Sequence, residues 1–145
     1  MRSVLRGTWW CLLCWLAMLP AMAAENEGQE DLDRAMEINA KARTMKDLSE
    51  IVNLCESAHK KGLDKSNAEF ANNLLASTLL RRGLVVARTL FEAEKVDPNW
   101  AQFRAFALSD LERAVKLDPK QAEAFFNIGR LELLPGGNRE HAKDA

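Results

Sequence analysis

Residues 107–129 read ALSDLERAVKLDPKQAEAFFNIG, and they carry the strongest structural signal in the chain. Apolar residues recur at intervals of three and four on both sides of Asp118-Pro119, which is the spacing of an amphipathic helix. Asp is a good N-cap residue, and Pro fits the first turn of a helix because its missing N–H is not needed there. The stretch therefore predicts two helices that meet at Asp118-Pro119.

Similar signals along the rest of the chain predict an all-α fold with about six helices. Asp47 follows Thr44 by three residues, and Glu69 follows Ser66 in the same way, so each pair predicts a capping box at a helix start. Gly62 suits a helix end, because glycine tolerates a positive φ. No segment shows the sustained alternation that a strand would need. The predicted helices span about residues 30–42, 44–61, 66–95, 99–116, 120–134 and 138–145.

Gly83 leaves two interpretations of the third helix open. It can sit within one long helix, or it can mark a turn between two shorter ones. We favour the long helix, because the apolar stripe continues from Leu84 to Phe91 without a new capping residue.

The order of small and large residues on the two sides of Pro119 resembles the tetratricopeptide repeat. That repeat closes its second helix with Ala-x3-Phe, a further Ala and a Pro, and opens the next helix with Trp-x2-Leu-Gly-x2-Tyr. Here Leu replaces the first Phe, Phe replaces Trp, Ile replaces Leu, and Glu132 stands at the Tyr position. The residues that match are Ala107, Leu111, Ala114, Pro119, Phe125, Ile128 and Gly129.

This resemblance implies an antiparallel helix-hairpin array, a TPR-like α-solenoid, over residues 30–145, with the last helix truncated. The small matching residues would let helices approach closely, and the large ones would fill the gaps. The match covers residues 100–145 well and residues 44–95 only as helix pairs. Ala58 and Ala114 could hold equivalent places, but they are 56 positions apart, whereas a strict array would separate them by about 34. One repeat is therefore expected to be extended.

Residues 1–23 have the layout of a cleaved signal peptide, and residues 24–29 that of a flexible leader. Arg2 and Arg6 precede an apolar run of eleven residues, and Ala21-Met22-Ala23 places small residues before the expected cleavage site. Retention as a membrane anchor is the alternative, which the length of the run disfavours because a span needs about 20 apolar residues. We expect an exported protein, periplasmic or secreted, that meets the membrane only through this signal.

The charge and the cysteine content of the mature chain restrict its possible partners and cross-links. Without Arg2 and Arg6 it carries 18 basic and 21 acidic residues, a net charge of −3, which argues against a nucleic-acid partner. It keeps only Cys55, so no internal disulfide can form. We expect Cys55 to be a small buried hydrophobe, and a functional thiol or an intermolecular bridge is the alternative.

No set of residues forms a recognisable active site, so we expect no enzyme, metal or cofactor. His59 lies among lysines near a helix end and is interpreted as a solvated or cap-adjacent residue. His141 has no acidic or sulfur partner at the sequence spacing of a metal site. Gly136-Gly137 is interpreted as a helix stop rather than a phosphate loop.

The candidate partner-binding residues lie on the outward side of the helix predicted over residues 120–134. Because Phe125 and Phe126 are adjacent, they cannot both face one core. Phe126 either packs on a neighbouring repeat or acts as an aromatic anchor in a groove beside Arg130. Nearby arginines at positions 81, 82 and 88 are interpreted as a solvated face, although they could add positive charge to the groove. The candidate groove residues are Phe126, Asn127, Arg130 and Leu133.

The resulting functional expectation is a non-catalytic protein–protein interaction scaffold. We favour the N-terminal helical-repeat part of a larger exported protein, whose partner would be a missing C-terminal domain, because an open repeat end leaves an apolar face uncovered. A stand-alone peptide-binding protein is the first alternative. The second is an accessory region of an exported hydrolase, such as an aspartyl-protease-like enzyme. Similar segments precede such domains in exported bacterial proteins, so the resemblance suggests that association.

Overall fold

In a computed structural model that describes residues 27–95 and 97–145, the chain folds as six helices without a strand in those ranges. The all-α prediction is therefore confirmed. The third helix runs unbroken through Gly83, as expected. The predicted signal peptide, residues 1–23, lies outside the described residues. The helices are α1 (Gln29–Lys41), α2 (Met45–Lys61), α3 (Lys65–Glu92), α4 (Trp100–Leu117), α5 (Ala122–Glu132) and α6 (Arg139–Asp144).

Local capping explains where α2 begins and ends. The Thr44 hydroxyl accepts the Asp47 N–H at 3.1 Å, and the Asp47 carboxylate accepts the Thr44 N–H at 2.9 Å, so the predicted capping box is confirmed. Gly62 ends the helix with φ of 106°, which an L side chain would rarely adopt. The Gly28 N–H donates to the Gly62 carbonyl at 2.9 Å, so the end of the expected flexible leader packs on this turn.

The start of α3 differs from the prediction, because Asp64 caps the helix instead of Ser66. The Asp64 carboxylate accepts the Asn67 N–H at 2.9 Å and the Ser66 hydroxyl at 2.8 Å. Asp and Ser are comparable N-cap residues, and the earlier of two adjacent candidates starts the helix here. The capping box expected at Ser66 and Glu69 is therefore wrong.

The two Asp-Pro boundaries form turns ahead of the helices. The Asp97 carboxylate accepts the Asn99 N–H at 2.7 Å, and the Asp118 carboxylate accepts the Lys120 N–H at 3.1 Å. Each Asp thus closes a short side-chain turn, as Asp does two residues ahead of a backbone amide. Consequently α4 starts at Trp100 and α5 at Ala122, a little later than expected. Asn99 and Gln121 hold the N-cap positions, so the expected caps at the two Asp residues are wrong.

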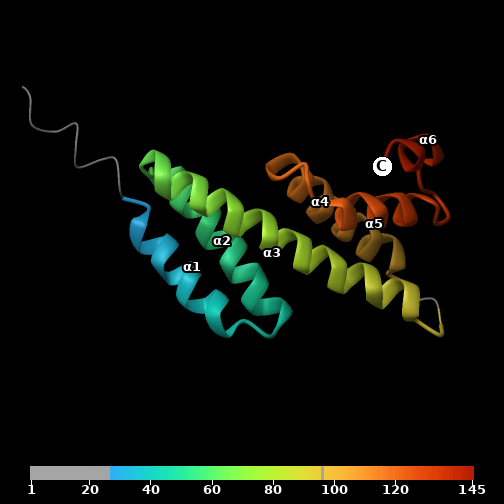
Figure 1. Cartoon of the computed structure of the whole chain (residues 1–145). Coiled ribbons are helices and arrows are strands. Elements are labelled where there is room, and N and C mark those ends of the chain that lie inside the picture. The colour runs from blue at the N-terminus through green and yellow to red at the C-terminus, as the bar shows by residue number, and fades with distance from the viewer. Residues whose placement is uncertain (1–26, 96) are drawn as a thin grey trace, which may run out of the picture.

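The long helix α3 connects the two ends of the molecule (Figure 1). Successive helices reverse direction, and the extensive contacts join each helix to the next, with one further contact between α3 and α5. The first half of α3 packs with α1 and α2 around Ile51, Cys55 and Leu79. Its second half packs with α4 and α5 around Leu111 and Leu131. Because α3 serves both cores, it is apolar around much of its circumference.

Gly83 permits the closest approach between α3 and α4. A Cβ on Gly83 would lie 2.8 Å from Cγ of Leu111 and 3.3 Å from the Ala107 carbonyl oxygen. A Cβ on Gly129 would instead meet the Ala142 carbonyl at 3.4 Å, an ordinary contact. The tight helix contact expected at Gly129 is therefore made by Gly83, which the repeat pattern did not single out.

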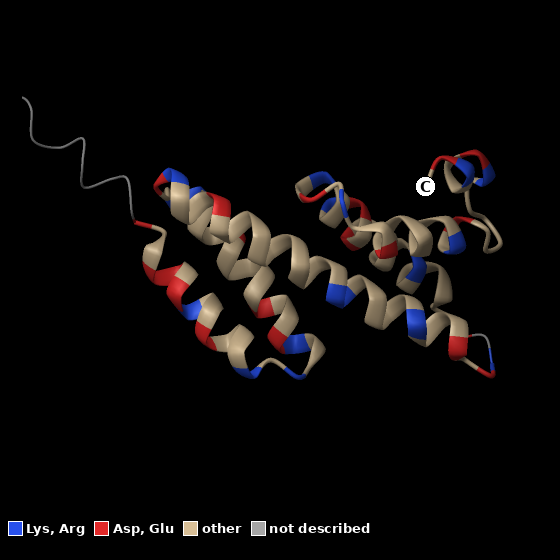
Figure 2. Ribbon diagram, viewed as in Figure 1, with Lys and Arg blue, Asp and Glu red and all other residues tan. Residues whose placement is uncertain are grey.

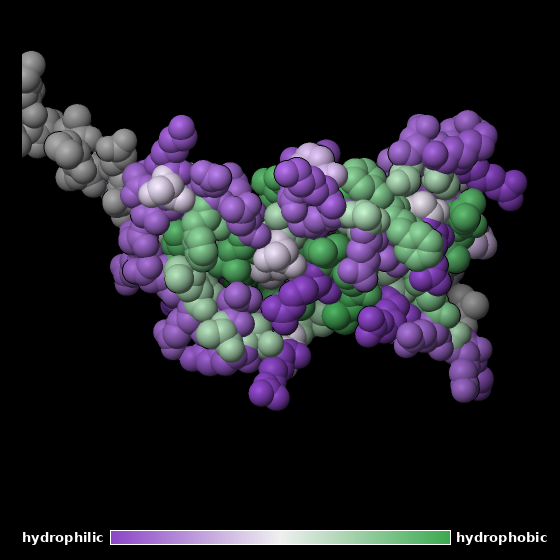
Figure 3. All heavy atoms as spheres, viewed as in Figure 1, coloured by the Kyte–Doolittle hydropathy of each residue, from purple (hydrophilic) through white to green (hydrophobic). Residues whose placement is uncertain are grey.

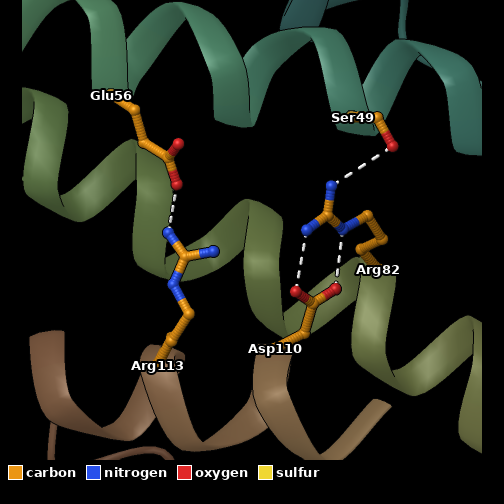
Figure 4. A network of polar contacts seen from close by, with 5 residues as sticks. All are labelled: Ser49, Glu56, Arg82, Asp110 and Arg113. Atoms are coloured by element: carbon orange, nitrogen blue, oxygen red, sulfur yellow. Dashed lines mark hydrogen bonds and ion pairs between the residues drawn. The ribbon is translucent and has the colours of Figure 1, made fainter. Parts of the chain in front are cut away.

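A buried ion pair joins α3 to α4 (Figure 4). The Arg82 guanidinium donates to both oxygens of Asp110, at 2.6 and 2.7 Å, and to the Ser49 hydroxyl of α2 at 3.2 Å. Arg82 is 7% exposed and Asp110 2% exposed, so the expectation of a solvated Arg82 is wrong. A more exposed pair, Arg113 and Glu56, lies beside it and joins α4 to α2.

Candidate functional site

A hollow of about 320 Å³ lies between α3 and α5 and brings together residues from both helices. Phe126, Asn127 and Arg130 line it, so three of the four candidate groove residues meet there. Their neighbours from α3 lie about 40 positions earlier in the sequence. The hollow is lined by Leu84, Arg88, Phe91, Glu92, Glu123, Phe126, Asn127 and Arg130.

The Arg130 guanidinium lies over two aromatic rings at this hollow. Its guanidinium carbon lies 3.8 Å from the ring centroid of Phe91 and 5.6 Å from that of Phe126. Such cation–π contacts contribute about 0.5–1 kcal/mol each at exposed sites. Within residues 27–95 and 97–145, no side-chain hydrogen bond or ion pair engages Arg130. The stacked face thus orients the guanidinium while its N–H donors stay available.

Phe126 remains at the surface beside this arginine. Its side chain is 64% exposed, whereas Phe125 is partly buried. Leu133, the fourth candidate, is 66% exposed and lines a second hollow of about 530 Å³, which Phe126 and Arg130 also border. Phe126 thus borders both a polar hollow and an apolar one. Figure 3 shows green apolar surface over the α4–α5 part of the molecule, interrupted by purple polar residues.

Asn127 lines the hollow, but its amide is engaged within its own helix. The side-chain nitrogen donates to the Glu123 carbonyl at 2.8 Å, and the residue is only 8% exposed. Bonding four residues back along a helix is common for a polar side chain that cannot reach solvent. Asn127 therefore shapes the floor of the hollow.

The charges around the hollow balance each other locally. Arg88 and Glu92 approach to 4.0 Å on the exposed side of α3, and Glu123 lies across from them on α5. Figure 2 shows acidic and basic residues interspersed along the helices. Arg88 is one of the arginines that could add positive charge to the groove, whereas Phe91 was visible in the sequence only as part of the apolar stripe of the third helix. The aromatic and cationic types were visible, but nothing local placed Phe91 beside Arg130.

The residues that match the repeat pattern occupy different environments. Ala107, Leu111 and Ala114 are fully buried, and Ile128 is 2% exposed. Pro119 lies exposed in the turn before α5. Phe125 and Gly129 are partly buried and border the apolar hollow near α6.

His141 has an acidic partner that its sequence position did not reveal. Its Nδ1 lies 3.1 Å from Oε1 of Glu132, and Oε2 of Glu132 accepts the Asn138 N–H at 2.8 Å. Burial opposes ionisation of Glu132, but the Asn138 N–H and the His141 ring together lower its pKa. The Glu132 hydrogen bond correspondingly raises the pKa of His141. The sequence spacing gave no acidic partner for His141, and the fold supplies one from nine positions away.

The remaining single residues of interest are Cys55 and His59. Cys55 is fully buried, as expected, and burial raises the pKa of its thiol to about 11. His59 is half-buried in the last turn of α2, and its Nε2 is inaccessible and without a hydrogen-bond partner among the described residues. It is therefore a cap-adjacent residue and is not fully solvated.

None of the helices in the described part of the chain has the length and apolar character that a membrane span needs. Comparisons with protein-family models, with curated proteins and with solved structures each give no match.

Proposed function

We propose that residues 30–145 form an exported, TPR-like helical-repeat module that binds a polypeptide segment at the α3–α5 groove. Successive antiparallel helices with alanines buried at their contacts support the repeat architecture. Stacked helix pairs of this kind offer extended surfaces for other polypeptides.

The observation that carries the proposal is the contact of the Arg130 guanidinium with the rings of Phe91 and Phe126. A guanidinium with oriented, unengaged N–H donors suits a carboxylate, which it can bind through two parallel hydrogen bonds. The apolar hollow that Phe126 also borders suits an aliphatic or aromatic side chain. The expected ligand is therefore an extended segment with an acidic residue close to an apolar one.

The module serves as a scaffold in a larger exported protein, with the groove docking another part of that polypeptide. The exposed apolar side chains of Phe126 and Leu133 support this, because a surface patch of this type is commonly covered by a partner. A separate peptide is an alternative occupant of the groove. A hydrolase domain, such as an aspartyl-protease-like domain, is a second alternative.

Selection from a random peptide library displayed on phage tests the groove. We expect enrichment of peptides with an acidic residue near an apolar one, measured afterwards by fluorescence polarisation on the synthesised peptides. Arg130→Gln and Phe126→Ala should each weaken binding about tenfold, or about 1.4 kcal/mol. Arg43→Gln and Phe70→Ala are the matched controls, since both residues are exposed and lie away from α5. Selected peptides that bind the Arg130 variant unchanged would contradict the groove assignment.

The export proposal has a separate test. The protein recovered from the exported fraction of an expressing cell should begin at Ala24 when its N-terminus is sequenced. An exported product that starts at Met1 would show that residues 1–23 are retained.

A further inference from the structure

Three potential metal ligands converge where α4, α5 and α6 meet. They are Glu112 of α4, Glu132 of α5 and His141 of α6, and one ligand atom from each lies within 4.8 Å of the other two. The set mixes one imidazole nitrogen with two carboxylate oxygens, and each donor comes from a different helix. This cluster lies apart from the α3–α5 groove, and it does not depend on the function proposed for that groove.

The distance between the ligand atoms of His141 and Glu132 fits a small tetrahedral ion. Zinc binds imidazole nitrogen and carboxylate oxygen at about 2.0–2.2 Å, so two such ligands on a tetrahedral centre lie about 3.3–3.5 Å apart. Nδ1 of His141 and Oε1 of Glu132 are 3.1 Å apart, so they need to separate only slightly. Glu112 is partly buried, and its ligand oxygen lies within 4.8 Å of both atoms, so it must move inward to complete the site.

The buried ligand is oriented by a group outside the cluster. Glu132 is 7% exposed, and its second oxygen accepts the backbone N–H of Asn138 at 2.8 Å. Metal-binding carboxylates are commonly held in this way by a hydrogen bond to the oxygen that does not bind the ion. The fixed oxygen leaves Oε1 directed toward His141.

The surroundings supply access and a structural reason for a cross-link. A hollow of about 320 Å³ adjoins the cluster and is bordered by Glu112, His141 and Asp144, with Lys116 as the cation on its rim. It admits an ion and leaves room for water at the fourth position. None of the residues of α6 is buried, so this helix lacks an apolar anchor of its own.

We propose that Glu112, Glu132 and His141 bind a zinc-class divalent ion that fastens α6 to α4 and α5. One imidazole and two carboxylates suit Zn²⁺, whereas Mg²⁺ prefers an octahedral shell of oxygen ligands and retains its waters. The ion stabilises the position of the short terminal helix, and three protein ligands leave one coordination position for water.

Calorimetric titration of the chelator-treated chain with ZnCl₂ tests the site. We expect one Zn²⁺ per chain, with no comparable heat from MgCl₂. Glu112→Gln and His141→Gln should each weaken Zn²⁺ binding at least tenfold. Glu140→Gln is the matched control, because this exposed acid lies on α6 and pairs with Lys143 instead. Far-UV circular dichroism of each variant establishes that the fold persists.

Proton NMR of the two histidine rings gives a second readout that does not rely on the variants. Addition of Zn²⁺ should shift the ring signals of His141 and leave those of His59 in place, since His59 lies on α2. The proposal is overturned if Zn²⁺ gives no saturable heat, if Glu140→Gln weakens binding as much as Glu112→Gln, or if the His141 signals stay unchanged at saturation.

Discussion

Removal of the Asp110 charge should destabilise the protein more than any change at a surface ion pair. The Asp110→Asn substitution keeps the side-chain shape and one acceptor oxygen, but it removes the negative charge and turns an NH₂ donor toward the Arg82 guanidinium. Arg82 is 7% exposed, and its other contacts, the Ser49 hydroxyl and the Phe106 ring 4.9 Å away, cannot balance its charge. Breaking a buried ion pair in this way costs about 3–5 kcal/mol. The free energy of unfolding of a domain of this size is about 5–15 kcal/mol, so the substitution should remove a large share of it.

Urea denaturation followed by far-UV circular dichroism measures this loss. At about 4 °C per kcal/mol, the corresponding fall in Tm is about 12–20 °C. Glu56→Gln is the matched control, because the Glu56–Arg113 pair belongs to the same region but is 45% and 39% exposed. An exposed pair contributes about 0.2–1 kcal/mol, so this variant should unfold close to the parent.

The double variant Arg82→Met/Asp110→Leu separates the value of the pair from the penalty of an unpaired charge. Replacing both partners by apolar side chains of similar volume is often neutral or stabilising, so most of the stability should return. The reasoning would be refuted if Asp110→Asn costs less than about 1 kcal/mol, or if the double variant is no more stable than the single one.

Three further perturbations probe packing, reactivity and capping. Gly83→Ala should cost about 1–3 kcal/mol in urea denaturation, because its Cβ meets α4 at 2.8 Å. Gly129→Ala, with an ordinary 3.4 Å contact, should be neutral or gain up to about 1 kcal/mol from helix propensity; equal losses at the two glycines would contradict the close approach. Burial raises the pKa of the Cys55 thiol to about 11, so iodoacetamide at pH 8 should label this thiol only in the unfolded chain. The free energy of unfolding should also fall as the pH rises above about 8.5, because the thiol then ionises in the unfolded chain before it ionises in the folded one. Rapid labelling of the folded protein would refute this. Thr44→Ala should cost about 1 kcal/mol, whereas Ser66→Ala should cost much less because its hydroxyl does not cap α3; the midpoints of urea denaturation compare the two.

Much of the helical framework was predictable from local sequence. The capping box at Thr44, the helix end at Gly62 and the continuity of α3 through Gly83 depend on residues within a few positions of one another. The incorrect cap at the start of α3 shows the limit of such reasoning. Asp64 and Ser66 are both competent N-cap residues, and the competition between them was not visible in the pattern.

The candidate sites, by contrast, depend on distances between helices. The Phe91–Arg130 stack, the Arg82–Asp110 pair and the Glu112–Glu132–His141 cluster join residues that lie 9 to 39 positions apart. The sequence alone determined which segments become helices and which faces are apolar, because the helical period and the caps are local properties. Only the tertiary structure decided which charged and aromatic side chains meet, because those contacts depend on how whole helices rotate and approach one another. The packing of α3 against both groups of helices, and its close contact with α4 at Gly83, determine that arrangement.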